Sequence, residues 1–457
     1  MKGLQRLNIM VTITVSLALL IIAIPADAES YTMQEDPLQV LMITGGGWHD
    51  YDVQHVLLEE ELSKRVNLDF TIDYTTGTDA DAIPEIHQND DWASEYDLVL
   101  YNSCHSGVED VEYIEGVVDA HVENQLPAVV LHCSMHTYRG DTMKWFEFVG
   151  ARSHRHESHQ PFTVELLEPS HPITVNFPSA WRTPHGELYE IVELMPGATP
   201  LIRAYGIDRN QFHPLAWTHE YEGVRVFSTT LGHHNVTMGS DVNLNLVASG
   251  LLWAAGLLNE DGSPAAGYEG ERELGWISLF DGETLDGWRA SENSDSFTVE
   301  DGRIVVDGPR SHLNYAGPID GGDFKNFEFK TDVYTYPQAN SGIFFHTRYQ
   351  HLGWPQHGYE AQVNASHSDR RKTGSLYAVS DVMDNAPHED EEWFEYYMRV
   401  AGNDIRFDID GETVLQFTEP DDREGTISLD RGTISLQAHD PDSRIYYRNL
   451  MIRLWPD

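Results

Sequence analysis

The hydrophobic pattern changes once along this 457-residue chain, and the change falls at residues 259–273. Before this segment, continuous apolar runs alternate with stretches of helical spacing, which is typical of a parallel sheet covered by helices on both faces. After it, short runs alternate between apolar and polar residues and are separated by turns, which is typical of an all-β fold. The segment itself (NEDGSPAAGYEGERE) has the acidic, glycine-rich composition of a linker. We therefore expect an α/β domain at 37–258, a linker at 259–273 and a β domain at 274–457.

Glycines, cysteines and histidines follow the predicted strands of the first domain. The apolar run Gln39–Ile43 leads into Gly45–Gly47, and the runs Asp97–Tyr101 and Pro127–Leu131 flank a helix-like segment, Val111–Asn124. Right-handed crossovers between such strands give a doubly wound sheet. Its site is expected at the carboxyl ends of the strands, where these polar residues lie.

The second domain contains nine short strand-like runs, separated by turn residues. Their alternating pattern predicts an all-β sandwich of the jelly-roll type. The runs are Phe297–Glu300, Arg303–Val306, Phe327–Val333, Gly342–His346, Tyr359–Val363, Tyr396–Val400, Asp404–Ile409, Thr433–Gln437 and Tyr446–Leu454.

The charge of the chain excludes several classes of partner. It carries 74 Asp and Glu against 29 Lys and Arg, a formal net charge of −45. Residues 274–457 hold 16 basic and 33 acidic residues, or −17, which leaves −28 for residues 1–273. Binding to nucleic acid requires a basic surface that neutralises phosphates, and an anionic membrane attracts basic segments. We therefore expect neither partner, and the acidity belongs to the whole surface.

The N-terminus has the composition of a targeting segment. Lys2 and Arg6 precede an apolar run from Ile9 to about Pro25, and Ala26–Ala28 offers an A-x-A cleavage site. This layout predicts a signal peptide at 1–28 and export to the periplasm or the extracellular space. An uncleaved anchor is the alternative, because the run is somewhat long. No later stretch is apolar enough to span a bilayer, so no stable membrane insertion is expected after cleavage.

Histidines are the main chemical feature of the first domain, which holds 16 of the 23 in the chain. His49 follows the glycine run, His132 ends a predicted strand, and His185-Gly-Glu187 and the pair at 233–234 come later. Neutral imidazole is the commonest metal ligand, and three such groups with a carboxylate hold zinc with one position open. The alternative for any one histidine is an ordinary surface or hydrogen-bonded residue.

Cys104 and Cys133 are the only cysteines. Each follows a predicted strand of one βαβ unit, so the two could meet at one edge of the sheet. A disulfide and two separate buried thiols both remain open. A catalytic Cys133 is a further alternative, with His185 and Glu187 as its base pair. The glycines that usually flank such a nucleophile are absent, because Leu131 and Met135 occupy their places.

Six motifs follow one another along the first domain: Met42–Asp50, Leu131–Arg139, Trp145–His156, His171-Pro172, Glu187–Tyr189 and Leu231–His233. In these motifs the domain resembles the trehalose-utilisation (ThuA-like) family, over about residues 38–258. The resemblance implies a fold similar to class I glutamine amidotransferases, which is flavodoxin-like, and it implies that His49, His132 and His156 are metal or substrate ligands. We expect zinc, calcium or manganese as the metal and no nucleotide cofactor.

A longer series of motifs follows in order along the second domain: Gly275–Trp288, Asn340–His346, Gly358–Val363, Thr373–Tyr377, Trp393, Asp410-Gly411, Leu436–His439 and Tyr447–Ile452. In these motifs the domain resembles the 3-keto-disaccharide hydrolase family over essentially all of residues 274–457. The resemblance implies a concanavalin-like sandwich, and substrates that are glycosides oxidised at C3 of the sugar by a separate sugar 3-dehydrogenase. One departure is His346, which stands where the family pattern has an arginine.

A 3-keto-glycoside needs a base near C2, an electrophile at the C3 oxygen and an acid for the leaving oxygen. Glu360 and Gln362 alternate along one run and share a face of its strand. We assign Glu360 as the base or a metal ligand and His346, on a neighbouring run, as a metal ligand or proton carrier. Lys372 would stabilise an enolate, and His439 is a further catalytic candidate.

Four other side chains are predicted to hold the sugar: Gln362, Tyr377, Arg348 and Trp393. The expected function is cleavage of 3-keto-glycosides by elimination and hydration. The alternative is a sandwich that only binds glycans, attached to a metal-dependent enzyme built on the histidines of the first domain.

Overall fold

The computed structural model describes residues 36–456. The predicted signal peptide, residues 1–28, lies outside this range. Within the described residues, no helix combines the length and apolar composition needed to cross a membrane.

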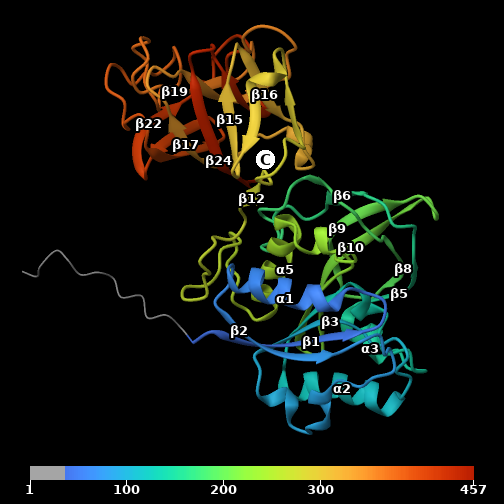
Figure 1. Cartoon of the computed structure of the whole chain (residues 1–457). Helices are drawn as coiled ribbons and strands as arrows, with labels where there is room; N and C mark the ends of the chain where they lie inside the picture. Colours follow the sequence, from blue (N-terminus) through green and yellow to red (C-terminus); the bar gives the residue numbers. More distant parts are fainter. Residues whose placement is uncertain (1–35, 457) are drawn as a thin grey trace, which may run out of the picture. The chain divides into compact units, whose positions relative to one another are not determined.

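A nine-stranded mixed sheet forms the centre of the α/β half (Figure 1). Its order is β2-β1-β3-β4-β11-β10-β9-β6-β7, and β5 pairs separately with β8. The first five strands are parallel, as predicted, whereas β10, β9, β6 and β7 add an antiparallel extension that the hydrophobic pattern did not predict. The strands are β1 (Leu38–Gly46), β2 (Leu68–Thr75), β3 (Leu98–Cys104), β4 (Ala128–Leu131), β5 (Ala151–His156), β6 (Thr163–Leu166), β7 (Ala180–Arg182), β8 (Tyr189–Leu194), β9 (Thr199–Gly206), β10 (Gln211–Tyr221) and β11 (Val224–Thr229).

Helices cover both faces of the parallel strands. Side chains of β1 alternate between two buried clusters: Met42 packs with Leu58 of α1 and the residues of α5, and Ile43 packs with Val117 of α2 and the residues of α3. This alternation is the reason that the strand appears in the sequence as a continuous apolar run. The helices are α1 (Tyr51–Ser63), α2 (Val111–Asn124), α3 (Lys144–Val149), α4 (Asn235–Met238) and α5 (Asp241–Ala254).

Glycine is required where β1 ends. Gly45 and Gly46 have φ values of +109° and +85°, which L side chains rarely adopt. A Cβ atom on Gly45 would lie 2.1 Å from the carbonyl oxygen of Thr75 on the neighbouring strand. The chain therefore turns sharply here, and the turn places Trp48 and His49 at the carboxyl edge of the sheet.

Two antiparallel sheets form the C-terminal half. One has the order β14-β15-β24-β17-β20-β21-β22, with β12 paired to β24, and the other has the order β13-β16-β23-β18-β19. The predicted β-sandwich is confirmed. Its strands are β12 (Ile277–Ser278), β13 (Trp288–Ala290), β14 (Phe297–Glu300), β15 (Arg303–Asp307), β16 (Ser311–Tyr315), β17 (Phe327–Thr335), β18 (Ser341–Thr347), β19 (Tyr359–Val363), β20 (Trp393–Ala401), β21 (Asp404–Ile409), β22 (Glu412–Thr418), β23 (Thr433–Ala438) and β24 (Arg444–Leu454).

The segment 259–273 has regular backbone contacts despite its linker composition. The amides of Gly270 and Arg272 donate to the carbonyl oxygens of Arg65 and Lys64, at 3.2 and 2.7 Å. The Arg272 guanidinium lies 2.8 Å from Asp241 of α5. These bonds attach the segment to the α/β half along part of its length.

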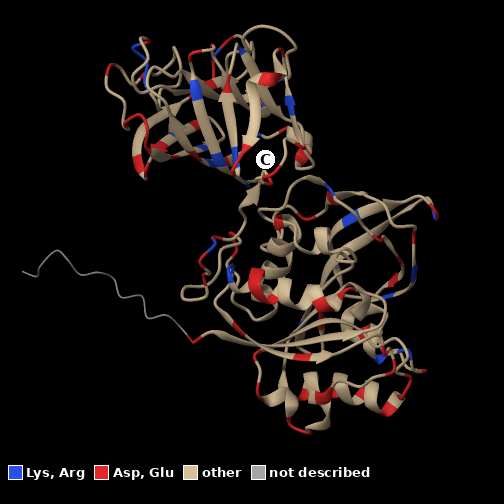
Figure 2. Cartoon of the chain, in the orientation of Figure 1, with Lys and Arg blue, Asp and Glu red and all other residues tan. Residues whose placement is uncertain are grey.

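Acidic residues are distributed over both halves of the described chain, with fewer basic residues among them (Figure 2). This agrees with the charges of −28 and −17 derived from the sequence.

Candidate functional sites

Histidines from several loops line a cleft at the carboxyl edge of the parallel strands. His49 follows β1, His132 begins the 3₁₀ turn after β4, Glu187 precedes β8, and His233 lies between β11 and α4. The cleft has a volume of about 460 Å³. We call it the histidine cleft, and its lining residues are Trp48, His49, Cys104, Cys133, His136, Arg139, His154, Arg155, His156, His159, Glu187, Tyr189 and His233.

One carboxylate lies among the imidazoles of this cleft. Glu187 Oε2 lies 3.0 Å from Nε2 of His132, and Oε1 lies 3.0 Å from Nδ1 of His156 and 2.9 Å from Nε2 of His159. Burial raises the pKa of Glu187, but the hydrogen bond and charge of His132 and the charges of two further histidines outweigh it and lower the pKa to about 2. The carboxylate is therefore ionised at neutral pH.

His49 completes the inner part of the cleft. Burial, together with the neighbouring His132 and His233, lowers the pKa of His49 to about 2. Its ring is therefore neutral, and neither ring nitrogen has a hydrogen-bond partner within residues 36–456. Donor atoms of His49, His132, Glu187 and His233 all lie within 4.8 Å of one another. Neutral imidazoles around one carboxylate are a donor set that suits a divalent cation.

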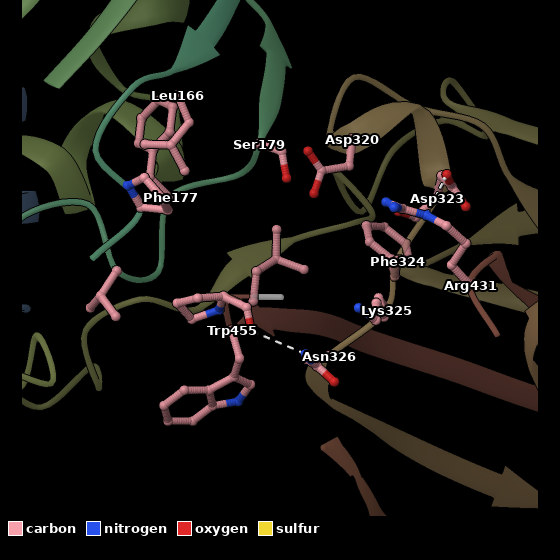
Figure 3. Close-up of a pocket in the computed structure, with 14 residues that line it drawn as sticks. Leu166, Phe177, Ser179, Asp320, Asp323, Phe324, Lys325, Asn326, Arg431 and Trp455 are labelled. Carbon is pink, nitrogen blue, oxygen red and sulfur yellow. Dashed lines mark hydrogen bonds and ion pairs between the residues drawn. The ribbon is translucent and has the colours of Figure 1, made fainter. Parts of the chain in front are cut away.

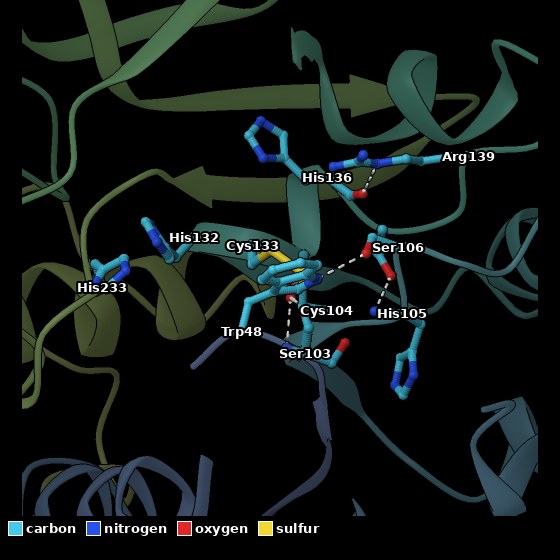
Figure 4. The surroundings of a disulfide bond; sticks show 12 residues. Trp48, Ser103, Cys104, His105, Ser106, His132, Cys133, His136, Arg139 and His233 are labelled. Carbon is cyan, nitrogen blue, oxygen red and sulfur yellow. Dashed lines mark hydrogen bonds between the residues drawn. A yellow bond between two sulfur atoms is a disulfide. The ribbon is translucent and has the colours of Figure 1, made fainter. Parts of the chain in front are cut away.

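A disulfide forms part of the lining of the histidine cleft (Figure 4). Cys104 and Cys133 are bonded, with their Cα atoms 5.2 Å apart. Of the two alternatives for the cysteines, the structure therefore has the disulfide and not two separate thiols. The disulfide also excludes Cys133 as a catalytic nucleophile, because its sulfur is already bonded. Trp48 lies beside the disulfide with 76% of its surface exposed, and its indole nitrogen donates to Ser106 Oγ at 3.2 Å.

The second candidate site lies on one face of the five-stranded sheet. Glu360 of β19 stands opposite Phe344 of β18, and Gln362 stands opposite Gly342. Gln437 of β23 lies on the same face and donates to Glu360 Oε1 at 3.1 Å. We call this cavity, of about 270 Å³, the sheet-face cavity; its lining residues are Asn340, Phe344, Trp354, Pro355, Glu360, Gln362, Tyr377, Gln437 and His439.

Glu360 has the chemistry of a general base. Burial of its carboxyl group raises its pKa to about 8, while the hydrogen bond from Gln437 favours the charged form and opposes this shift. A Cβ atom on Gly342 would lie 2.5 Å from Glu360 Oε1, so the glycine leaves room for the carboxyl group. A carboxyl group with a pKa near neutrality can take and return protons under physiological conditions.

Three further side chains that line the cavity are imidazole, indole and phenol groups. His439 Nδ1 lies 2.6 Å from Asp440 Oδ2, which fixes the orientation of the ring. The Trp354 ring lies 5.3 Å from the His439 ring and is 43% exposed. Tyr377 donates from its hydroxyl to Asp369 Oδ2 at 3.0 Å. An exposed aromatic ring beside polar groups is an arrangement that suits a sugar.

Family models match both halves. The ThuA model, described as trehalose utilisation, matches residues 39–254, and the 3-keto-alpha-glucoside-1,2-lyase-like model matches residues 275–453. The chain joins a ThuA domain to a 3-keto-alpha-glucoside-1,2-lyase-like domain. We refer below to the ThuA domain and the lyase-like domain.

Individual relatives are similar to parts of the chain. A 3-keto-disaccharide hydrolase of Bacteroides thetaiotaomicron is 39% identical over 80 residues, which are 16% of this chain and about a quarter (27%) of that protein. A ThuA-like protein of Parabacteroides merdae is 22% identical, with a TM-score of 0.39, over 52% of this chain and 98% of that one. A proposed glycosyl hydrolase of Parabacteroides distasonis is 21% identical, with a TM-score of 0.35, over 40% of this chain and 94% of that one.

The assignment of His346 to the site of the lyase-like domain is wrong. His346 has φ +52° and lies at a β-bulge, where the register between β18 and β23 shifts. The extra residue of a bulge turns the following side chains to the other face. The imidazole is buried, its Nε2 lies 2.8 Å from the carbonyl oxygen of Lys325, and its Nδ1 accepts from the Asp430 amide at 3.2 Å.

Three further predicted residues do not line the sheet-face cavity. Lys372 donates from Nζ to the carbonyl oxygen of His367 at 2.8 Å, inside its own loop. Arg348 is exposed and pairs with Asp430 at 2.7 Å. Trp393 begins β20 of the other sheet, where the Arg448 guanidinium lies 4.0 Å from its ring centre. By contrast, Glu360, Gln362, Tyr377 and His439 all line this cavity.

Four residues bring their donor atoms together in the inner part of the histidine cleft: His49, His132, Glu187 and His233. The metal prediction from the sequence included the first two of them and omitted the other two. His49 and His132 lie together, whereas His156 contacts the other oxygen of Glu187. Glu187 and His233 were not assigned as ligands, although both belong to histidine-containing motifs of the sequence. Loop residues so far apart in sequence give no spacing from which their meeting could be predicted.

Another cavity, of about 310 Å³, includes Leu166, Phe177, Asp320 and Trp455 (Figure 3). No histidine or glutamate is among the described residues that line it. Its carboxyl group at Asp320 accepts the backbone amide of Ala180 at 2.8 Å. Asp323, Lys325 and Arg431 also line it, and Arg431 pairs with Asp323 at 2.8 Å. Unlike the two candidate sites, it has no imidazole beside its carboxyl groups among the described residues.

Proposed function

We propose that the chain is an exported carbohydrate-active enzyme whose lyase-like domain cleaves 3-keto-glycosides. The observation that carries the proposal is Glu360: a carboxyl group with a pKa of about 8 in a cavity lined by amide, imidazole and aromatic side chains. The family match to a 3-keto-alpha-glucoside-1,2-lyase-like domain supports the substrate class. A sugar 3-dehydrogenase, as a separate enzyme, would supply the oxidised substrate.

The reaction follows from the ketone at C3. Ionised Glu360 takes the acidic proton from C2, and the electron pair of that bond passes to the C3 oxygen as an enolate. When the enolate collapses, the C3 ketone returns, a C1–C2 double bond forms and the C1–O bond breaks. The leaving oxygen takes a proton from His439, whose ring is oriented by Asp440. Water then adds its hydroxyl to C1 and a proton returns to C2, so the net change is hydrolysis.

Other side chains of the sheet-face cavity would hold the sugar. Gln362 donates to Asn340 Oδ1 at 2.8 Å, and its own Oε1 is buried without a partner among the described residues. A sugar hydroxyl would satisfy this oxygen. Tyr377 supplies a second polar contact, and the exposed Trp354 ring supplies an apolar face for stacking.

For the ThuA domain we propose a divalent cation held by His49, His132, Glu187 and His233. The ring nitrogens of His49, which have no hydrogen-bond partner among the described residues, support this assignment. Donors that are mostly nitrogen favour zinc over calcium, which prefers oxygen. When bound, the cation would supply an electrophile for the carbonyl oxygen of a related oxidised sugar. Arg139 and Trp48, which also line the cleft, would position that sugar.

A second candidate function is a glycan-binding sandwich attached to a metal-dependent ThuA enzyme. The exposed Trp354 beside His439 favours it, since such a ring could bind a sugar without any reaction. In this case all turnover would depend on the histidine cleft, and Glu360 would contribute to binding alone.

The test uses the full chain with a 3-keto-glucoside and the matching unoxidised glucoside. We expect turnover of the oxidised substrate only, and its loss in Glu360→Gln. Loss of turnover in His49→Ala, with normal turnover in Glu360→Gln, would instead establish the second candidate. Release of aglycone from the unoxidised glucoside would contradict the elimination mechanism, because its C2 hydrogen is not acidic.

We also propose export on the composition of residues 1–28, which N-terminal sequencing of the secreted or periplasmic protein would test. The strand order β2-β1-β3-β4-β11 supports the flavodoxin-like assignment of the ThuA domain. The two antiparallel sheets support the concanavalin-like jelly-roll assignment of the lyase-like domain.

A further inference from the structure

We propose that Gln437 recognises the hydroxyl group at C2 of the sugar, so that the lyase-like domain accepts only 3-keto-glycosides whose 2-hydroxyl is free. The inference rests on the cleavage proposed above and specifies which oxidised sugars the sheet-face cavity takes. Gln437 was not among the site residues predicted from the sequence. It belongs to β23, is buried, and lines the cavity together with Glu360.

The face of the five-stranded sheet that carries Gln437 is polar, although most of it is buried. Ile343 and Leu436 belong to the apolar core, and the residues that alternate with them along their strands lie on the opposite face. Among the four buried side chains with an unpartnered atom that this face presents, only the two glutamines line the cavity. Buried polar atoms normally have a hydrogen-bond partner, so these two carbonyl oxygens are candidate acceptors for a ligand. The atoms without a partner among the described residues are His312 Nε2, Ser435 Oγ, Gln362 Oε1 and Gln437 Oε1.

Glu360 extends between these two glutamines because Gly342 leaves room for it. Gly342 stands opposite Gln362 of β19, and the register of β18 with β23 places Gln437 on its other side. A Cβ atom on Gly342 would lie 2.5 Å from Oε1, 2.8 Å from Cγ and 3.0 Å from Cδ of Glu360. The carboxyl group therefore lies over the glycine, with an amide on each side of it.

The hydrogen bond to Glu360 orients the amide of Gln437. Its Nε2 lies 3.1 Å from Glu360 Oε1, and the ionised carboxylate that acts as the base can only accept. The nitrogen of the amide therefore faces the base, and the carbonyl oxygen is left for another donor. Because the two atoms share one carbon, that donor must be a group close to the atom whose proton Glu360 takes.

The 2-hydroxyl is the substituent that meets this requirement. Glu360 takes its proton from C2, whose ring neighbours are C1 and C3. The glycosidic and ring oxygens on C1 carry no hydrogen, and the oxygen on C3 belongs to the ketone, so none of them can donate. The hydroxyl on C2 can donate to Gln437 Oε1 while the hydrogen on C2 faces the carboxylate. One amide would thus hold both the base and the reacting carbon.

The first test compares two substrates on the wild-type full chain: a 3-keto-glucoside and its 2-deoxy analogue, which keeps an acidic hydrogen at C2. Each kcat/KM is divided by the rate of hydroxide-catalysed elimination of the same compound, which removes the difference in intrinsic reactivity. We expect the corrected value to be at least about 100-fold lower for the analogue, since it leaves a buried carbonyl oxygen unpaired. Equal corrected values would overturn the inference.

The second test changes the two glutamines in turn. Gln437→Leu has no acceptor, so its preference for the 2-hydroxyl should disappear. The matched control Gln362→Leu should lose efficiency with both substrates by the same factor and keep the preference. The bond from Gln437 lowers the pKa of Glu360, so the pH profile of kcat/KM in Gln437→Leu should also move to higher pH. A preference that persists in Gln437→Leu, or disappears in Gln362→Leu, would contradict the assignment.

Binding of unoxidised sugars separates this inference from the proposed cleavage. Calorimetry with methyl glucoside and methyl 2-deoxyglucoside needs no turnover, and thermal unfolding shows that each variant is folded. If no 3-keto-glycoside is cleaved, the proposed function fails and the affinity ratio decides the inference. About 10-fold weaker binding of the deoxy compound, abolished in Gln437→Leu, would then support the contact with the 2-hydroxyl, and equal binding would overturn it. If Gln437→Leu does not fold, the comparison of substrates on the wild type decides.

Discussion

The two candidate sites are built in different ways. In the ThuA domain the functional side chains come from loops at the carboxyl edge of the sheet, such as His49 after β1 and Glu187 before β8. In the lyase-like domain they come from the strands themselves and share one face of a sheet, as Glu360, Gln362 and Gln437 do. Strand residues are placed by a simple alternation, whereas loop residues are placed by the path of the backbone. A site built on strands can therefore be predicted residue by residue, whereas for a site built on loops only the location can be predicted.

The largest expected effect tests the site on the sheet face. Glu360→Gln removes the base but keeps the shape and the hydrogen bond from Gln437, so turnover of a 3-keto-glucoside should fall by about 10²–10⁴-fold. The matched control is Glu412→Gln, an exposed glutamate of β22, which should leave turnover unchanged. Equal activity of the two variants would remove Glu360 from the mechanism.

The disulfide allows the loop-built site to be perturbed alone. Cys104→Ser opens a cross-link between positions 29 residues apart, which should reduce the free energy of unfolding by about 3–4 kcal/mol. Chemical denaturation of wild type and variant measures the loss, and Cys133→Ser should give the same value. Because Cys133 adjoins His132, metal affinity should fall too, while activity attributed to Glu360 stays normal. A loss confined to Glu360 activity would contradict the separation of the two sites.

Gly342→Ala tests the strand-built site without changing Glu360 itself. The new Cβ would lie 2.5 Å from Glu360 Oε1 and displace the carboxyl group from its position. A displacement of about 1 Å can reduce turnover by about 100-fold. Gly116→Ala, at an open position of helix α2, serves as the control with unchanged turnover. A normal kcat in Gly342→Ala would show that the carboxyl position is not critical.

The pH dependence of turnover tests the state of Glu360. With a pKa of about 8, the ionised fraction rises about 50-fold between pH 6 and pH 8, and kcat/KM should rise with it. Stability should change in the opposite direction. The folded state holds this proton more tightly than the unfolded state, so the contribution of Glu360 to stability falls between about pH 4.5 and pH 8. The free energy of unfolding of Glu360→Gln, relative to that of wild type, should therefore be higher at pH 9 than at pH 5. Chemical denaturation of both proteins at each pH measures this difference.

The smallest effect is expected from Arg348→Ala. Its partner Asp430 is 60% exposed, and Arg348 itself is 57% exposed, so the loss of the ion pair should cost less than about 1 kcal/mol. Turnover should remain normal, since the side chain does not line the sheet-face cavity. A rise in KM for the oxidised sugar would show that Arg348 contacts the substrate. It would also weaken the conclusion that position on a strand decides which residues line the site.

The sequence alone determined much of the architecture. The continuous apolar run of β1 and the alternating runs after residue 273 distinguished a buried parallel sheet from an antiparallel sandwich, because side chains in strands alternate between faces. The same alternation placed Glu360 and Gln362 together. It failed at His346, because a bulge changes the register by one residue and the sequence carries no mark of it. The antiparallel extension of the nine-stranded sheet was also missed, since its strands lack a continuous apolar pattern.

Only the tertiary structure decided which loops meet. The sequence indicated that His49 and His132 follow strands, but it left Cys104 and Cys133 open between a disulfide and free thiols and gave no ligand role to Glu187 or His233. These residues are up to 184 positions apart, and no local preference links them. Strand order and the turns after each strand bring them to one edge of the sheet. The physical reason is that periodicity fixes the face on which a residue lies, whereas contacts between distant loops arise only when the whole sheet is assembled.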